Sequence, residues 1–417
     1  MVPLQPQGSL ATPHVEMNPL MAIKPAGPLI LALNCGSSSI KFALFDPSRI
    51  AHGRKPEWSG SVEDVGSDAP LFKADGVQAH TVHAGDADSH PAALELVRKC
   101  VDERLGGRTL VAVAHRVVHG GSKYSQPVRV DAAVFADLVS YIPLAPLHQP
   151  FALDAIKLFL AALPEVAQIA CFDTAFHHTL PEVERMLPLS REAWQQGIRR
   201  YGFHGLSYQF VAQAIDEHYG DRARQRVIVA HLGSGASLCA MRDLQSVATT
   251  MGFSALDGLM MGTRCGALDP GVLFYMLETG KLSPDRLAQV LYHESGLLGL
   301  SGISSDPRAL LARENEEPAR QALTLYVRSI VREICALTGA LGGFDMLVFT
   351  AGIGEHNAVV RERVCAKLGF FGLTLDADAN VSNKPVISRT DSKVFVAIEP
   401  TNEEWVAASS AATLISN

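Results

Sequence analysis

The sequence has little of what marks a nucleic-acid-binding, membrane-spanning or disulfide-stabilised protein. Its 417 residues carry 36 Lys and Arg against 43 Asp and Glu, a formal net charge of −7. It therefore lacks the positive field that non-specific nucleic-acid binding requires. No apolar run reaches the roughly 18 residues of a membrane helix. The seven cysteines are odd in number and form no Cys-x-x-Cys pair, which argues against a disulfide framework or a zinc knuckle.

The sequence also lacks the composition of a disordered chain. Charged residues are 19% and hydrophobic residues 47%, so we expect a packed globular fold. At about 100–200 residues per domain, the length indicates two or three domains. Residues 1–28 lack the basic start and apolar run of a signal peptide. We therefore expect a flexible N-terminal extension and a cytoplasmic protein.

Short apolar runs alternate with amphipathic segments, which is typical of an α/β fold. The runs that predict strands are 29–34, 41–45, 111–114, 168–172, 227–230 and 346–350. Helices are predicted over 91–105, 207–218 and 317–341. Residues 50–90 are polar and turn-rich. A strand followed by a glycine turn near each end of the chain suggests two related halves.

Three glycine-rich loops follow predicted strands, at 36–39, 233–235 and 352–354. Glycine lets the backbone approach an anion closely, and successive N–H groups form phosphate-binding concavities. One such loop is weak evidence, but three with adjacent hydroxyls favour a phosphate site. The chain has no Gly-x-x-x-x-Gly-Lys-Ser/Thr motif, which excludes a P-loop ATPase. It has no complete Gly-x-Gly-x-x-Gly after a strand, which argues against a dinucleotide dehydrogenase.

Arg116 and Arg264 lie beside glycines with little other charge nearby in the sequence. A guanidinium group suits carboxylate and phosphate, although a structural arginine paired with an aspartate is an equally good interpretation of either one alone. Most of the fifteen histidines are better interpreted as core or surface residues, since no His-Glu-x-x-His motif occurs. His204 is the exception, because it lies in a glycine-flanked turn before a helix.

Two carboxylates lie at the ends of predicted elements. Asp173 follows the strand at 168–172, and Glu403 opens the last helix. Magnesium takes hard oxygen ligands, usually one or two carboxylates with phosphate oxygens and waters. From spacing alone, Glu403 is better explained as an acidic residue that the helix dipole favours in a first turn.

Together these motifs resemble the acetokinase (acetate kinase) family, from about residue 29 to the C-terminus. The matching segments, in the order of the family, are 34–41, 115–121, 145–148, 172–177, 200–205, 231–235, 258–266, 295–302, 352–355 and 400–404. The resemblance implies two ribonuclease H-like domains with a central cleft, the actin-like ATPase fold shared with sugar kinases and heat-shock chaperones. It places the domains at 29–172 plus 405–417 and at 173–404. It also implies a homodimer and the reversible, magnesium-dependent, in-line transfer of phosphoryl from ATP to acetate.

The resemblance assigns roles residue by residue. Catalytic roles fall on Arg116, Asp173, His204 and Arg264, and magnesium (or manganese) on Asn34 and Glu403. Arg116 also binds substrate, and Val118, Leu147 and Phe203 form the apolar pocket for the methyl group. Contacts to ATP or ADP fall on Ser37, Ser39, Lys41, His231, Leu232, Gly233, Ser234, Gly235, Asp306, Pro307, Arg308, Gly352, Ile353, Gly354, Glu355 and His356. Because acetate is already ionised at neutral pH, we expect Asp173 to orient magnesium, its waters or an arginine rather than act as a base.

The chain departs from the usual family pattern at a few positions. Ser234 stands where the family usually has Asn, and Ala351 and His356 replace a Gly and an Asn, which leaves the nucleotide preference open. Ala255 replaces a Pro, and Phe151 ends a segment that usually reads His-Asn-Pro-Pro. The loss of a proline ring enlarges the pocket, so we expect propionate to be accepted with acetate preferred.

Three alternatives stay open. A propionate or butyrate kinase of the same family differs only in pocket volume. An actin-like conformational ATPase would not need Arg116, Arg264 and His204 together. A sugar kinase would need a polar pocket where Val118 and Phe203 give an apolar one.

Overall fold

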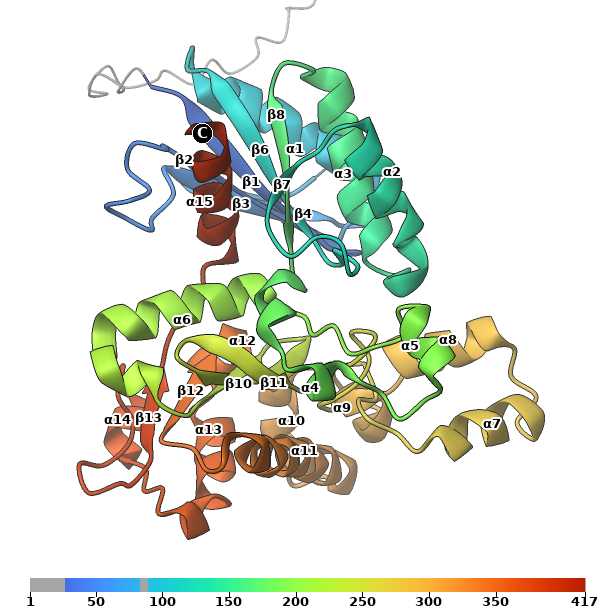
Figure 1. Ribbon diagram of the computed structural model, residues 1–417, viewed down its shortest axis with the longest axis vertical. Coiled ribbons are helices and arrows are strands. Elements are labelled where there is room, and N and C mark those ends of the chain that lie inside the picture. The colour runs from blue at the N-terminus through green and yellow to red at the C-terminus, as the bar shows by residue number, and fades with distance from the viewer. Residues whose placement is uncertain (1–26, 83–88, 417) are drawn as a thin grey trace, which may run out of the picture.

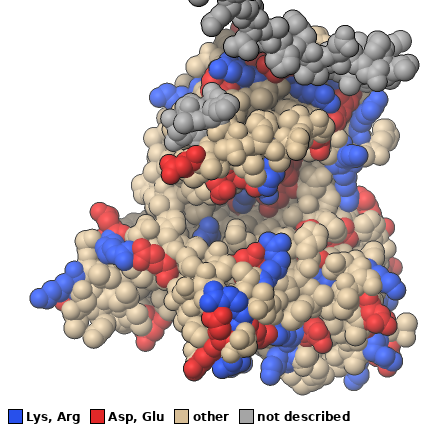
Figure 2. All heavy atoms as spheres, turned by 180° about the vertical axis from the view of Figure 1, so that it is seen from behind, with Lys and Arg blue, Asp and Glu red and all other residues tan. Residues whose placement is uncertain are grey.

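The computed structural model describes residues 27–82 and 89–416, which form two lobes along the long axis of the molecule (Figure 1). Each lobe is built on one sheet covered by helices. The expected N-terminal extension lies outside the described residues, apart from Gly27 and Pro28. The surface is hollowed between the lobes (Figure 2).

The first sheet has the strand order β5-β4-β3-β2-β1-β6-β8-β7. Its strands are β1 (Leu29–Cys35), β2 (Ser39–Phe45), β3 (Trp58–Glu63), β4 (Leu71–Ala74), β5 (Val77–Thr81), β6 (Leu110–Val117), β7 (Val128–Arg129) and β8 (Ala167–Phe172). The second sheet has the order β11-β10-β9-β12-β13. Its strands are β9 (Val227–Leu232), β10 (Ala236–Arg242), β11 (Gln245–Thr249), β12 (Met346–Thr350) and β13 (Phe395–Ile398).

The two sheets share one topology. In each, three consecutive strands pair antiparallel, and two later strands add parallel to the first strand of the meander. The order β3-β2-β1-β6-β8 of the first sheet thus repeats as β11-β10-β9-β12-β13 in the second. This repeat confirms the two related halves suggested by the strand and glycine turn near each end of the chain.

The longer helices cover the sheets. They are α1 (His90–Leu105), α2 (Ala132–Ser140), α3 (Gln149–Ala162), α6 (Gly205–Tyr219), α7 (Pro270–Glu278), α8 (Pro284–His293), α11 (Glu317–Leu341), α13 (Ala358–Ala366) and α15 (Glu403–Ser416). The short ones are α4 (Glu182–Arg185), α5 (Arg191–Gln195), α9 (Gly296–Ser301), α10 (Pro307–Leu311), α12 (Ala351–His356) and α14 (Ala377–Val381). No helix of the described ranges is long and apolar enough to cross a membrane.

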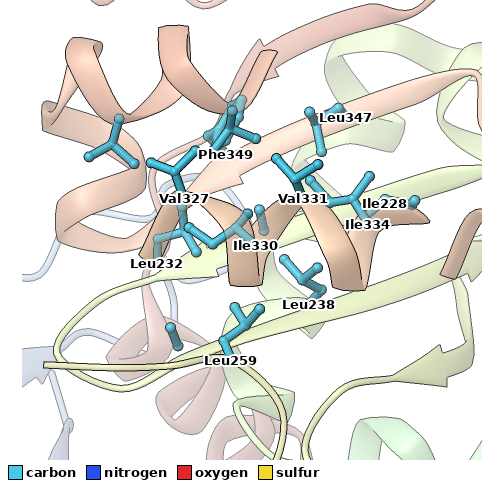
Figure 3. Packing of buried hydrophobic residues seen from close by; sticks show 14 of the residues in the cluster. Ile228, Leu232, Leu238, Leu259, Val327, Ile330, Val331, Ile334, Leu347 and Phe349 are labelled. Carbon is cyan, nitrogen blue, oxygen red and sulfur yellow. The ribbon is translucent and has the colours of Figure 1, made fainter. Parts of the chain in front are cut away.

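Helix α11 forms the core of the second lobe. Val327, Ile330, Val331 and Ile334 lie at helical spacing and pack on side chains of the second sheet such as Leu238 (Figure 3). The observed bounds, Glu317–Leu341, are those predicted from the sequence. Burial of such apolar side chains stabilises a fold by roughly 25 cal/mol per Å², so this face fixes the helix on the sheet.

Helix α6 is apolar on two faces because it lies between the lobes. Leu206, Phe210 and Ala214 pack with the first sheet and with α15, while Tyr208 and Ile215 face the second sheet. Helix α15 comes back from the end of the chain to cover the first sheet (Figure 1). Both helices begin at the hollow between the lobes, so their first residues can serve a site there.

The structure corrects three expectations. The polar segment 50–90 contains β3, β4 and β5, which were missed because they are short and because every residue of β5 is exposed. Strand β6 continues through His115 and Arg116 to Val117, beyond the predicted range 111–114. The glycines at 352–354 belong to helix α12 and not to a loop.

Candidate active site

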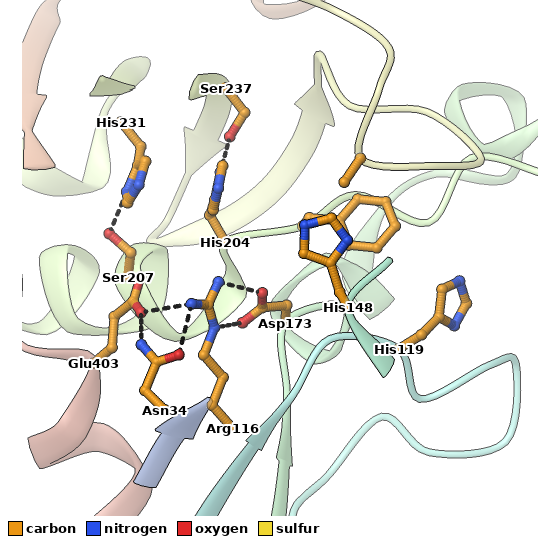
Figure 4. Close-up of polar contacts among 12 residues, drawn as sticks. Asn34, Arg116, His119, His148, Asp173, His204, Ser207, His231, Ser237 and Glu403 are labelled. Atoms are coloured by element: carbon orange, nitrogen blue, oxygen red, sulfur yellow. Dashed lines mark hydrogen bonds and ion pairs between the residues drawn. The ribbon is translucent and has the colours of Figure 1, made fainter. Parts of the chain in front are cut away.

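The site on the first lobe lies where β1, β6 and β8 end. Asn34 is near the end of β1, Arg116 near the end of β6, and Asp173 follows β8 directly. These strands are parallel neighbours, so their carboxyl ends meet at one edge of the sheet. Glu403, the first residue of α15, joins them there (Figure 4).

Arg116 is at the centre of this group. Its Nε donates to Asp173 Oδ1 over 2.9 Å, and its Nη2 donates to Asp173 Oδ2 over 2.6 Å. Its Nη1 donates to Asn34 Oδ1 over 3.1 Å and lies 3.4 Å from Glu403 Oε2 (Figure 4). The fork-on-fork contact fixes the guanidinium plane. Both carboxylate oxygens of Asp173 are thus engaged by one arginine.

The charges of this group depend on one another. Burial opposes ionisation of Asp173 and raises its pKa, while Arg116 acts in the other direction. Burial also opposes the charge on Arg116, but Asp173 and Glu403 together hold its pKa above the ordinary value. Burial also opposes ionisation of Glu403, but Arg116, His231, Lys41 and a hydrogen bond from Asn34 together lower its pKa. The group is thus a network in which opposite charges offset one another.

Arg264 approaches the same site from the second lobe. Its Nη1 donates to the carbonyl of Ala255 over 3.0 Å, and its Nη2 lies 3.0 Å from His148 Nε2. Across the described chain, Arg264 forms no ion pair with a carboxylate. Burial lowers its pKa, and Arg116 adds repulsion. The positive charge of Arg264 is therefore left without a counter-charge from the protein.

His148 can accept a hydrogen bond from Arg264 at Nε2 because its imidazole is neutral. Burial, together with Arg264 and Arg116, lowers its pKa to about 3. Sequence reasoning gave His148 no role, although it lies in the family segment 145–148. Its contact with Arg264 joins residues 116 positions apart, which spacing along the chain cannot show.

His204 lies at the N-cap of α6 with left-handed backbone angles, φ 59° and ψ 27°. Its Nδ1 lies 2.8 Å from Ser237 Oγ, and its ring stacks on His231 at 4.1 Å between centroids. A Cβ placed on Gly235 would lie 3.4 Å from His204 Nε2 and 3.6 Å from Arg264 Nη1. Glycine at 235 thus leaves room for a ligand to reach both groups. Burial, His231 and the two arginines hold the pKa of His204 well below its ordinary value.

The segments predicted to contact nucleotide meet at the ends of β9 and β12. Gly262 N–H donates to Ser234 O over 3.3 Å, and a Cβ on Gly262 would lie 3.2 Å from Ser305 O. A Cβ on Gly233 would lie 3.7 Å from the Cβ of Ala351, at the start of α12. Segments 231–235, 305–308 and 351–356 are therefore neighbours.

Individual residues of these segments differ in exposure. Asp306 caps α10 and pairs with the exposed Arg308, and His356 is exposed at the end of α12. Ala351 has φ +64°, a backbone conformation that costs a non-glycine residue about 1 kcal/mol. Glycine would adopt this conformation without that cost.

The remaining predicted residues lie around the same hollow. Lys41 faces Asn34 across the antiparallel β1–β2 pair and has an exposed side chain, Ser37 lies in the turn joining those strands, and Ser39 begins β2. Val118 and Phe203 pack in one apolar cluster with Ala255. Leu147 is half-buried and directly precedes His148.

The predicted magnesium ligands fit a site completed by substrate. No group of three or more metal-ligating side chains occurs in residues 27–82 and 89–416. Glu403 accepts hydrogen bonds from described residues only at Oε2, which leaves Oε1 for a cation. One carboxylate and one amide with phosphate oxygens and waters is a usual magnesium environment. Both oxygens of Asp173 accept from Arg116, whereas Glu403 keeps Oε1 and Asn34 Oδ1 keeps one lone pair beside the bond from Arg116 Nη1, so Asn34 and Glu403 fit the ion better.

The comparisons with known proteins agree with this fold and site. The family model described as the acetokinase family matches residues 29–409. An acetate kinase of Rhodopseudomonas palustris (strain TIE-1) is 47% identical over 386 residues, 91% of this chain and 96% of the relative. An acetate kinase of Methylocella silvestris is 45% identical over 389 residues, 91% of this chain and 96% of the relative.

Two solved structures are similar over nearly the whole chain. A propionate kinase from Francisella tularensis has a TM-score of 0.85 at 33% identity, with 92% of this chain and 98% of that chain covered. A Porphyromonas gingivalis acetate kinase has a TM-score of 0.81 at 35% identity, with 93% and 100% covered. These comparisons confirm the actin-like fold and a kinase that uses ATP. The chain belongs to the acetokinase family.

Proposed function

We propose that the protein is an acetate kinase, which reversibly transfers the terminal phosphoryl group of ATP to acetate and gives acetyl phosphate and ADP. The observation that carries this proposal is Arg264, a cation with no carboxylate partner in residues 27–82 and 89–416, beside His204 and the glycine loop 233–235. Such a cation suits an anionic ligand. Arg116, already oriented by Asp173, lies on the opposite wall.

The reaction brings an anionic carboxylate to an anionic phosphate. In phosphoryl transfer the protein mainly positions the reactants and offsets charge. A small carboxylic acid titrates near the pKa of a Glu side chain, about 4.3, so acetate needs no base at neutral pH. Arg116 and Arg264 offset the repulsion, and Asp173 acts by holding Arg116.

Magnesium is the metal we propose, with manganese as a substitute. Asn34 and Glu403 would hold it through their side-chain oxygens. When bound, the ion neutralises charge on the phosphate oxygens. Lys41, across from Asn34 on β2, adds a further positive charge near the nucleotide phosphates.

The pocket for the methyl group favours acetate without excluding propionate. Val118 and Phe203 supply an apolar wall with Leu147 nearby, and Ala255 occupies less space than the proline usual in the family. One methylene discriminates by only about 1–3 kcal/mol. We expect measurable kcat/KM with propionate, below that with acetate; a propionate rate at background would contradict this.

We also propose that the protein is a cytoplasmic homodimer. Helix α7 supports the dimer, because none of its residues is buried and Phe274 and Tyr275 expose 62% and 65% of their surface. Exposed apolar faces of this kind mark interaction sites. The packing of α15 on the first sheet supports the division into 29–172 plus 405–417 and 173–404.

The test is formation of acetyl hydroxamate from ATP, acetate and hydroxylamine. An acetate kinase gives hydroxamate and ADP in equal amounts. Slow ATP hydrolysis without hydroxamate would instead support an actin-like conformational ATPase. A panel of acetate, propionate and butyrate with several nucleotides then defines the acceptor and the effect of Ser234 and His356 on the donor.

A further inference from the structure

A buried chain of hydrogen bonds lies behind His204, on the side away from Arg264. His204 Nδ1 is 2.8 Å from Ser237 Oγ on β10, and Ser237 Oγ is 2.5 Å from Tyr208 Oη on α6 (Figure 4 shows the first contact). The side chains of Ser237 and Tyr208 are fully buried. In the described part of the chain, neither hydroxyl has a further polar partner.

The protons of this chain can be placed by counting donors and acceptors. A buried O–H without an acceptor loses a hydrogen bond that water would have supplied. Among the described residues, the hydroxyl of Tyr208 has one hydrogen-bond partner, Ser237 Oγ, so its proton must point to that atom. Burial raises the pKa of Tyr208 well above its ordinary value, so the phenol keeps that proton.

The proton of Ser237 then has one acceptor left, which is His204 Nδ1. If Nδ1 carried a proton and donated it to Ser237, the serine proton would have no acceptor. Nδ1 is therefore the accepting nitrogen, and a neutral His204 carries its proton on Nε2. That nitrogen faces Gly235 and Arg264, where a ligand can approach.

We propose that Ser237 and Tyr208 are positioning residues that hold His204 as its Nε2–H tautomer, so that the imidazole donates a hydrogen bond to the transferring phosphoryl group. This inference rests on the proposed function, which supplies the acceptor. The tautomer matters because the other form would present a lone pair to an anion. A donor fixed in place before the reaction stabilises developing charge without reorganisation.

The protein contains a matched pair outside the site. His177 Nδ1 lies 2.8 Å from Ser246 Oγ, and His177 Nε2 lies 2.9 Å from the carbonyl of Phe203. His177 and Ser246 are buried, as are His204 and Ser237. Because the carbonyl of Phe203 already accepts from His177 Nε2, this histidine has no free ring nitrogen to offer a ligand. Ser246→Ala therefore measures the cost of losing a buried Ser–His hydrogen bond without loss of a site donor.

The direct test is the protonation state of each nitrogen of His204 by NMR of the whole protein labelled with ¹⁵N-histidine. His204→Gln assigns the signals. We expect a proton on Nε2 and none on Nδ1 in the wild type, and a detectable Nδ1–H form in Ser237→Ala. A wild-type His204 protonated on Nδ1, or a tautomer unchanged in Ser237→Ala, would overturn the inference.

Kinetics supply the second test. We expect Ser237→Ala to lower kcat by about tenfold to a hundredfold with KM values for ATP and acetate nearly unchanged, the usual size of such supporting contacts. Ser237→Thr, which keeps the hydroxyl, should recover most of kcat, and Tyr208→Phe should have a smaller effect. Ser246→Ala should keep kcat within about twofold at a similar loss of thermal stability. Equal kcat losses in Ser237→Ala and Ser246→Ala would overturn the positioning role.

The two proposals fail in different ways. A wild-type protein that forms no hydroxamate would overturn the proposed function, whatever the tautomer. An active enzyme whose His204 carries its proton on Nδ1 would overturn only this inference. If Ser237→Ala does not fold, the wild-type NMR assignment and Tyr208→Phe still decide the matter.

Discussion

Arg116 and Arg264 face one site, but Arg116 is paired with carboxylates and Arg264 contacts neutral groups. Arg116 is held by Asp173, Asn34 and Glu403, and its guanidinium has a fixed orientation. Among the residues that the structure describes, Arg264 donates only to neutral groups, chiefly a carbonyl and His148. The first arginine is thus set in place by the protein, and the second keeps its charge for a ligand. A site that brings two anions together needs an arginine held in a fixed orientation and an arginine whose charge is available to a ligand.

The largest expected effect is the loss of catalysis when Arg264 is replaced. Arg264→Ala removes the cation that has no protein counter-charge, so kcat/KM for acetate should fall by about 10²–10³, the range found for a single group that stabilises developing charge. The measurement is hydroxamate formation with acetate varied at saturating ATP. A rate near wild type would show that Arg264 does not face the reacting groups.

The second effect is on stability and concerns Arg116. Arg116→Ala leaves Asp173, whose side chain is 2% exposed, without its partner. Removing one member of a buried ion pair costs about 3–5 kcal/mol. Urea unfolding at neutral pH measures this loss. Double replacement with Asp173→Ala should recover part of it; no recovery would argue against pairing as the cause.

Asp173→Asn tests whether Asp173 acts by holding the guanidinium group of Arg116 in one orientation. The amide keeps the shape but turns one acceptor into a donor that faces Arg116, so the guanidinium loses its fixed plane. We expect kcat/KM for acetate to fall by about tenfold to a hundredfold, with a higher KM for acetate. Complete loss of turnover with normal binding of magnesium, nucleotide and acetate would instead indicate a direct chemical role.

The smallest expected effect is the pH dependence of the free energy of unfolding, to which the neutral histidines of the site contribute. Half-buried His148 and buried His231 have pKa values lowered to about 3 and about 4, against about 6.5 when unfolded. The unfolded chain therefore binds more protons below pH 6.5, and stability falls as the pH drops from about 6.5 toward the folded pKa values. At pH 5.5 each such histidine should cost about 1.4 kcal/mol relative to pH 7.5.

Urea unfolding of the wild type and of His148→Gln at the two pH values measures this contribution. The Gln variant should lose about one histidine's share of the difference. Glu403 adds nothing in this window, because its pKa is already lowered and its contribution is lost only at more acidic pH. An unchanged difference in His148→Gln would contradict a neutral His148.

Local signals predicted much of the fold. Helix α11 was predicted to the residue, since its apolar period is regular, Pro318 lies in its first turn, and Gly342 follows it at φ 70°. Strand β5 was missed because all its residues are exposed and give no alternation. Helix α12 was missed because its glycines at 352 and 354 are typical of loops.

The site was predicted less by spacing than by resemblance. Spacing left Glu403 as an ordinary first-turn acid and gave Arg116 even odds of being structural. Contacts between distant elements, such as Arg264 with His148 and His204 with Ser237, leave no local pattern. Periodicity reports which face of an element is buried, and it does not report which polar residues meet across lobes.

The measurement that tests the central claim most directly is the free energy of unfolding of Arg264→Ala at neutral pH, compared with that of Arg116→Ala. If Arg264 has no counter-charge from the protein, its removal leaves no unpaired buried acid, and the stability should stay within about 1 kcal/mol of wild type. A loss as large as that of Arg116→Ala would show that the protein does compensate Arg264, and would contradict the division between the two arginines.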